Sequence, residues 1–434
     1  MKKVFLSIIG LTACLATLRA QETVYPAKAQ QGLVFLKNAT IHTGAGQVIE
    51  RGTIGFSNGK IIAVGANVPI PADDVRVFDV QGQHIYPGLI ASDSNLGLTE
   101  VESVRATNDY SEVGDINPSV RSIISYNTDS KIINTLRTNG ILIAQVVPEG
   151  GLVTGSSSVV QLDAWNWEDA AYKTDNGIHF YMPRLMPRSN PFGAEARGPG
   201  NDAVKEAMER IESVKGFFRE AKAYLDGGSK KNGTNLKYES VKGLFDRSQK
   251  LFVHCDLMKE MIVAADMGQE FGFDVVIVGG TDSWMITGLL KKNGIPVILS
   301  QPHSLPVMQD DDVDQPYKTP AILQKAGILF SISNEGFWQQ RNLPFNAGTA
   351  GAYGLTKEEA LSAITLNAAK ILGIAEKTGS LEVGKDANIV VSTGDILDMK
   401  SSVITKAYIQ GREVDLTDKH KQLYERYKHK YNLQ

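Results

Sequence analysis

Cysteine is scarce in this chain: among 434 residues there are two, Cys14 and Cys255. Cys14 lies in an N-terminal segment that we expect to be removed, which leaves Cys255 without a disulfide partner. A fold held together by disulfides is therefore excluded, and stability must come from a hydrophobic core, for which 42% hydrophobic residues are ample. Cys255 directly follows an apolar run, so we interpret it as a small buried residue.

An excess of basic charge is also missing. The chain holds 45 lysines and arginines against 48 aspartates and glutamates, a formal net charge of −3. Nucleic acid requires a basic face, so we expect no nucleic-acid partner. After the N-terminal segment, no uncharged apolar run reaches the ~20 residues that a membrane-spanning helix needs. We therefore expect no transmembrane span.

The N-terminal segment "MKKVFLSIIGLTACLATLRAQ" has two lysines, then an apolar stretch, then a small residue, Ala20. This order is typical of a signal peptide over residues 1–20, and it predicts an exported protein of the periplasm or cell envelope. A second interpretation stays open, because "LTAC" has the form of a lipidation site and would make the protein a lipoprotein through Cys14.

Both ends of the remaining chain have a β pattern. Within residues 32–86, "TIGFSNGKIIAVG" contains two strand-like runs joined by Asn58-Gly59, a strong hairpin signal. Residues 376–415 resume the same style with "GSLEVGKDANIVV" and "VITKAYIQGREV". We predict a small composite β-sandwich domain built from these two parts. Residues 416–434 then form a charged, amphipathic helical tail.

The middle part, residues 87–375, alternates between helical segments and short apolar runs. Helices that end in glycine precede most of these runs, which is typical of parallel β/α construction. The runs are "ILIAQVV" (141–147), "KLFVHC" (250–255), "DVVIVGG" (274–280), "IPVILS" (295–300) and "ILFSISN" (328–334). Their number favours an α/β fold with a closed, TIM-like (β/α)8 barrel. An open doubly wound sheet stays an alternative, although no Gly-rich nucleotide motif follows an early strand.

Four segments make the chain similar to the amidohydrolase superfamily and, within it, to the imidazolonepropionase-related group. They are "IYPGLI" entering the barrel, "GDINPSVRSIISYNTDS" after the first strand, the strand end "FVHC", and "LTKEEALSAITLNAAKILGI" followed by "GSLEVGKDANIVV". The resemblance spans roughly residues 32–415. It implies a barrel with a composite sheet domain, and hydrolysis of non-peptide C–N bonds at a metal centre.

The resemblance also implies a set of metal ligands at strand ends, and this chain departs from it. Family members use a His-x-His pair after strand one, a Lys or Glu from strand four, single histidines after strands five and six, and an aspartate after strand eight. Metal held in this way lowers the pKa of water towards ~7. The corresponding positions here are Asp93 and Asn95, Glu195 by position only, His254, Gly279 and Asn334.

Only one imidazole of the family's ligand set is kept. We therefore predict no metal centre of the family type and no cofactor. A single divalent ion (Zn, Mn or Ca) held by Asp93, Asn95 and His254 stays an alternative. The candidate catalytic residues are Asp93, His254 and Asn334, and the candidate ligand-binding residues are Asn95, His303, Trp165 and Trp167. We interpret the isolated histidines 42, 84 and 179 as ordinary strand or loop residues.

Two hypotheses on function follow, and they leave open whether the protein is an enzyme. The first is a catalytically silent member with a degenerate metal site, which binds an unknown small molecule or stabilises a partner. That partner would be a second copy or an intact amidohydrolase. The alternative is an active hydrolase with a metal-free or single-metal site, in which Asp93 or His254 is the base, while Asn95 and Asn334 stabilise the developing oxyanion. A weaker third hypothesis is a structural interaction protein that uses the surface around Trp165 and Trp167 and the helix predicted over residues 201–226.

Overall fold

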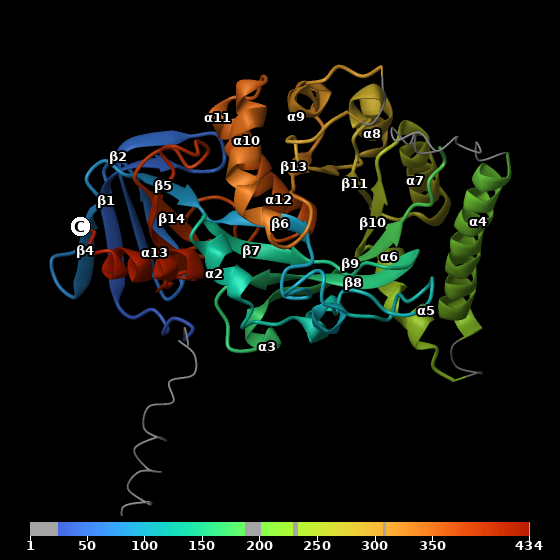
Figure 1. Cartoon of the computed structure of the whole chain (residues 1–434), viewed down its shortest axis with the longest axis horizontal. Coiled ribbons are helices and arrows are strands. Elements are labelled where there is room, and N and C mark those ends of the chain that lie inside the picture. Colours follow the sequence, from blue (N-terminus) through green and yellow to red (C-terminus); the bar gives the residue numbers. More distant parts are fainter. Residues whose placement is uncertain (1–24, 187–200, 229–232, 307–309, 434) are drawn as a thin grey trace, which may run out of the picture.

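The computed structural model describes residues 25–186, 201–228, 233–306 and 310–433. These residues form two eight-stranded sheets, one assembled from both ends of the chain and one from its middle (Figure 1). The second sheet follows the α/β barrel arrangement that the sequence predicts. No helix within these described ranges is long and apolar enough to cross a bilayer.

The first sheet has the order β16-β15-β14-β5-β1-β2-β3, and β4 also pairs with β1. Its strands are β1 (Leu33–His42), β2 (Val48–Ser57), β3 (Lys60–Gly65), β4 (Val75–Asp79), β5 (His84–Pro87), β14 (Ile389–Ser392), β15 (Ile404–Ile409) and β16 (Arg412–Glu413). The β2–β3 turn at Asn58-Gly59 has positive φ at both residues, as a tight hairpin turn requires. The two ends of the chain meet where β5 pairs antiparallel with β14.

The second sheet runs from β6 to β13 in chain order and is nearly closed. Its strands are β6 (Leu89–Ser94), β7 (Ile141–Val146), β8 (Val153–Gln161), β9 (Ala171–Tyr181), β10 (Lys250–Cys255), β11 (Val275–Gly279), β12 (Val297–Leu299) and β13 (Phe330–Ile332). Where the first and last strands approach each other, the Ser333 hydroxyl donates to the Ser92 carbonyl. The side chains of β7 and β8 are buried throughout, as expected for strands covered on both faces.

The expectation of a uniformly parallel β/α barrel is wrong at one strand. β8 runs antiparallel to both β7 and β9, and short connections rather than crossover helices join these three strands. A parallel neighbour needs a crossover of a dozen or more residues, whereas an antiparallel one needs only a short turn. The sequence "VTGSSSVVQ" of β8 is rich in serine, so its apolar pattern is weak.

Helices surround the barrel. The longer ones are α2 (Lys131–Arg137), α4 (Asn201–Ala223), α7 (Met258–Phe271), α8 (Thr287–Asn293), α9 (Gln315–Ala326), α10 (Leu343–Ala352), α11 (Lys357–Ala363) and α12 (Leu366–Leu372). Short helices are α3 (Trp167–Ala170), α5 (Leu236–Ser240) and α6 (Lys242–Phe245), and the tail forms α13 (Lys419–Lys430). Several end at a glycine in the left-handed conformation, such as Gly272 after α7 and Gly327 after α9, before the next strand begins.

Candidate functional site at the barrel mouth

A cavity of about 610 Å³ opens where the carboxyl ends of the barrel strands converge. The parts of the chain that follow β6, β9, β10, β11, β12 and β13 all contribute to its wall. The carboxyl end of a β/α barrel is where such folds carry their chemistry. The cavity therefore lies at the position where a functional site is expected.

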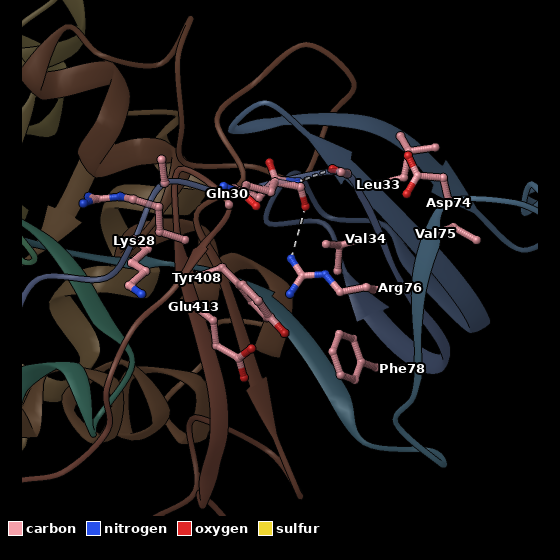
Figure 2. A pocket seen from close by; sticks show the side chains of 15 residues that line it. Lys28, Gln30, Leu33, Val34, Asp74, Val75, Arg76, Phe78, Tyr408 and Glu413 are labelled. Atoms are coloured by element: carbon pink, nitrogen blue, oxygen red, sulfur yellow. Dashed lines mark hydrogen bonds between the residues drawn. The ribbon is translucent and has the colours of Figure 1, made fainter.

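A second hollow, of about 870 Å³, lies in the first sheet between β4 and the β15–β16 hairpin (Figure 2). Figure 2 shows Arg76 in its wall, and the guanidinium Nη2 of this residue donates to the Gln31 carbonyl at 3.3 Å. Gln30 donates to the Gly32 carbonyl and accepts from the Gly59 amide. These contacts tie the chain segment before β1 to the sheet, so we assign them a structural role.

Asp93 lies near the end of β6 in an unusual backbone conformation. Its φ is +55°, in the left-handed region that aspartate tolerates better than most residues. The turn is held from both sides, because the Asp93 amide donates to Gln145 Oε1 at 3.2 Å and its carbonyl accepts from Gln340 Nε2 at 3.3 Å. Burial raises the pKa of the Asp93 carboxyl to about 7, with smaller contributions from Glu149 and Glu335.

Two histidines from neighbouring strands meet beside Asp93. His179 of β9 and His254 of β10 approach with Nδ1 of the first 2.8 Å from Nε2 of the second. The same Nε2 of His254 lies 4.0 Å from Asp93 Oδ1. One ligand atom from each of the three residues lies within 4.8 Å of the others. Burial lowers the pKa of both imidazoles, so they are neutral at neutral pH.

Aromatic rings hold these two imidazoles in place. The His179 ring stacks on Phe252 with centroids 4.8 Å apart, and the His254 ring stacks on Tyr181 at 3.9 Å. Phe252 is fully buried in the barrel. The side chains thus have little freedom to turn away from each other.

A hydrogen-bond network surrounds the Nε2 atom of His179. Gln145 has a fixed amide orientation, because its Oε1 accepts from a backbone amide, and its Nε2 donates to Ser157 Oγ at 3.0 Å. The Ser157 hydroxyl donates its one hydrogen to Asn176 Oδ1 at 2.9 Å. His179 Nε2 lies 2.7 Å from the same hydroxyl oxygen, and with this arrangement of Ser157 and Asn176 it donates to that oxygen. This leaves a lone pair on His179 Nδ1, directed towards His254.

These residues fit a divalent metal of the zinc type. Two neutral imidazoles and one carboxylate are the kind of three-ligand set that catalytic zinc sites use. The N–H of His179 that faces away from the cluster is held by an acceptor, as is usual for metal-binding histidines. Among the described residues, the Asp93 carboxylate accepts no hydrogen bond and has His254 as its nearest partner. The Asp93 carboxylate thus has lone pairs that no other described group uses, whereas the His179 Nδ1 lone pair faces His254 Nε2 at 2.8 Å, a contact that a bound ion would replace.

Two other positions of the family set, Gly279 and Asn334, offer no free ligand atom. Gly279 has φ of +97°, and a Cβ there would lie 2.7 Å from Asp256 Oδ1, so a side chain does not fit. Asn334 follows β13, and both ends of its amide are used. Its Oδ1 accepts from Asn346 Nδ2 at 2.6 Å, and its Nδ2 donates to the Gln339 carbonyl at 2.7 Å.

Of the residues singled out from the sequence, the structure brings Asp93, Asn95 and His254 together in the cavity wall. His303 lies elsewhere, with Nε2 2.6 Å from Thr349 Oγ1, and does not line this cavity. Glu195 lies outside the described residues.

Trp165 and Trp167, the other two candidate ligand-binding residues, do not line this cavity. Trp165 and Trp167 follow β8, and because β8 is antiparallel, the β8–β9 connection lies at the amino-terminal end of the barrel. Trp165 is 65% exposed there and contacts Tyr25.

Sequence reasoning missed His179. The residue lies in "TDNGIHFY", whose Asp-Asn-Gly turn signal masks the end of a long strand. β9 is the fourth strand of the barrel sheet, so His179 comes from strand four, for which the sequence offered Glu195. The one available signal was the alternation of apolar residues around His179, which predicts a strand running into the barrel mouth.

Comparison with known proteins agrees with this architecture. The model of the amidohydrolase family matches residues 323–414. An imidazolonepropionase from Mesorhizobium japonicum is 26% identical over 397 residues, which are 84% of this chain and 93% of that protein. The imidazolonepropionase of Streptococcus sanguinis is 24% identical over 393 residues, with 81% and 86% covered.

Solved structures give the same result. The crystal structure of an amidohydrolase from Thermotoga maritima superimposes with a TM-score of 0.76 at 26% identity, and it covers 88% of this chain and 99% of that one. Molinate hydrolase, at 15% identity and a TM-score of 0.55, shares the fold. In sequence and fold the chain is thus similar to amidohydrolases and, over most of its length, to imidazolonepropionases.

Proposed function

We propose that this protein hydrolyses non-peptide C–N bonds with one divalent metal ion held by Asp93, His179 and His254. The observation that carries the proposal is the convergence of these three donors within 4.8 Å at the barrel mouth. The sequence favoured a silent member because it showed one imidazole at the expected positions. The second imidazole, supplied by β9, removes that reason.

A bound ion of this kind supplies Lewis acidity, which polarises a carbonyl group and makes water more acidic. The chain supplies the remaining functions. Ser157 holds the proton of His179 on Nε2, and the ring stacking of Tyr181 on His254 keeps the second imidazole directed at the same point. The residues that hold the metal are thus positioned before any ligand arrives.

A hydrolase also needs a base that takes a proton from water. Asn334, at the family's aspartate position, cannot accept one. The next residue, Glu335, lines the cavity and lies close enough to Asp93 to raise the pKa of its carboxyl. We assign the proton transfer to the Glu335 carboxylate.

The test is hydrolysis by the metal-loaded protein of a panel of N-acyl amines, lactams and cyclic amides of the imidazolone type. Wild-type protein and a His303→Ala control, altered outside the cavity, should cleave the same members of the panel. Glu335→Gln should lower kcat by about 10²–10⁴-fold, the usual contribution of a general base. Equal kcat values for Glu335→Gln and wild type would remove the assigned base.

A second candidate function is binding without catalysis, in which the protein takes up a ligand or stabilises a partner such as an intact amidohydrolase or a second copy. The observation that favours it is the saturated Asn334 amide at the position where the family has its proton acceptor. Metal-loaded protein that cleaves no member of the panel, but changes its molar mass by light scattering when a partner is added, would establish this alternative.

A further inference from the structure

We propose that the substrate of this cavity is cationic and rich in hydrogen-bond donors, such as an amide that carries an ammonium or guanidinium group. This inference rests on the proposed function, since it names the substrate class of that same site. The first observation is the sign of the charges in the cavity wall.

Three carboxylates in the wall stand apart from the other described residues. Glu102, Glu149 and Glu335 line the cavity together with Asp93, and among the described residues none of the three accepts a side-chain hydrogen bond or forms an ion pair. Among the lining residues that the structure describes there is one permanent cation, the exposed Arg184. The cavity wall is therefore predominantly negative, and its carboxylate oxygens offer free lone pairs to a ligand.

Two other acidic residues of the same wall serve as an internal comparison. Asp256 Oδ1 accepts from Thr281 Oγ1 at 2.7 Å. Glu260 accepts from the backbone amides of Leu185, Asp256 and Leu257 at 3.1–3.3 Å. These carboxylates have a structural role that their contacts explain. No such contact explains Glu102, Glu149 or Glu335.

An independent observation also indicates a donor-bearing occupant. Asn95 lines the cavity and is 9% exposed, yet its Oδ1 is buried and accepts no hydrogen bond from the part of the chain that the structure describes. Buried polar atoms are nearly always paired, so an orphaned acceptor needs an explanation. Rotation of the Asn95 amide towards the cavity would let a donor group of the ligand supply the missing partner.

The half-buried Glu149 shows the repulsion between carboxylates that a bound cation would relieve. Burial raises the pKa of its carboxyl, and the neighbouring Glu102 and Glu335 raise it further. Like charges that face one cavity repel each other unless a positive group lies between them. An anionic substrate would add to this repulsion, whereas a cationic one removes it.

The test uses isothermal titration calorimetry with agmatine, which carries a guanidinium and an ammonium group, and with glutarate as the anionic probe. Titrations are made on the full chain in the presence of a chelator and again after loading with metal. Agmatine should bind in both states. Glu149→Gln should weaken it by at least about tenfold, since a partly buried charge pair is lost. Glutarate should give no binding heat.

The control is Glu376→Gln, which removes an exposed acid outside the cavity and should bind agmatine like wild type. Glutarate binding more tightly than agmatine, or equal agmatine affinities in Glu149→Gln and the control, would overturn the proposal. So would the loss of a bound Mn²⁺ ion in Glu149→Gln, because the carboxylates would then hold a second metal. If agmatine binds with the expected dependence on Glu149 but no metal binds, hydrolysis fails while the ligand class stands.

Discussion

Replacing Asp93 by asparagine should stabilise the metal-free protein at pH 8 and leave its stability unchanged at pH 4. The pKa of this carboxyl is about 7 in the folded protein, against 3.8 for an ordinary aspartate. Between these two pH values the folded state binds the proton more tightly than the unfolded state. The Asp93 contribution is therefore favourable below pH ~4 and is lost as pH rises through ~7.

The size of the stability change follows from the shift in the pKa of the Asp93 carboxyl. Each pKa unit corresponds to about 1.4 kcal/mol, so a shift from 3.8 to about 7 corresponds to about 4 kcal/mol. The Asp93 side chain is 23% exposed, and water reaching the carboxylate reduces the effect, so this value is an upper bound. The asparagine side chain is neutral at every pH and resembles the protonated aspartate, so the variant should gain up to this amount at pH 8.

The assay is urea unfolding of both proteins in a chelating buffer at a series of pH values from 4 to 8. His254 contributes with the opposite sign: burial lowers its pKa to about 3, so its stability contribution is lost as pH falls below ~6.5. This contribution is common to both proteins and cancels in the difference between their unfolding free energies. A difference in unfolding free energy between Asp93→Asn and wild type that does not change with pH would contradict this prediction. The control is Asp129→Asn, which alters a 79% exposed carboxylate and should differ from wild type by the same amount at every pH.

The remaining predictions concern the metal ligands, the barrel and the N-terminus. Ser157→Ala removes the acceptor of the His179 N–H and should lower metal affinity about 10–100-fold in a competitive chelator titration. Gly279→Ala should destabilise the protein by about 1–3 kcal/mol in urea unfolding, because φ is +97° and the Cβ would meet Asp256 Oδ1 at 2.7 Å. Equal stability would show that the strand end can shift. Export predicts a mature chain that begins at Gln21, which mass spectrometry of the secreted protein can check; a mass that includes residues 1–20 would contradict it.

Much of the barrel could be predicted because its strands are short apolar runs that follow helices ending in glycine. β10 and β11 are of this kind, and their parallel pairing places His254 at the barrel mouth as expected. β8 and β9 escaped detection because their serines and an internal Asp-Asn-Gly turn interrupt the apolar pattern. Their burial is decided by the neighbouring strands rather than by their own composition.

The candidate site could be predicted in part for the same reason. Asp93, Asn95 and His254 directly follow or end recognisable strands. His179 belongs to an unrecognised strand, and its pairing with His254 depends on the register between β9 and β10. The direction of β8 also decides that Trp165 and Trp167 lie at the opposite end of the barrel, which no local pattern indicates.

In the proposed site, Asp93, His179 and His254 together hold one divalent metal ion. The most direct measurement is metal content by mass spectrometry on purified full-length protein after incubation with Zn²⁺, Mn²⁺ or Ca²⁺ and removal of free ion. The account predicts about one ion per chain in wild type and in the His303→Ala control, and far less in His179→Ala and in His254→Ala. Wild-type protein without metal under all three conditions, or His179→Ala with metal content equal to wild type, would contradict it.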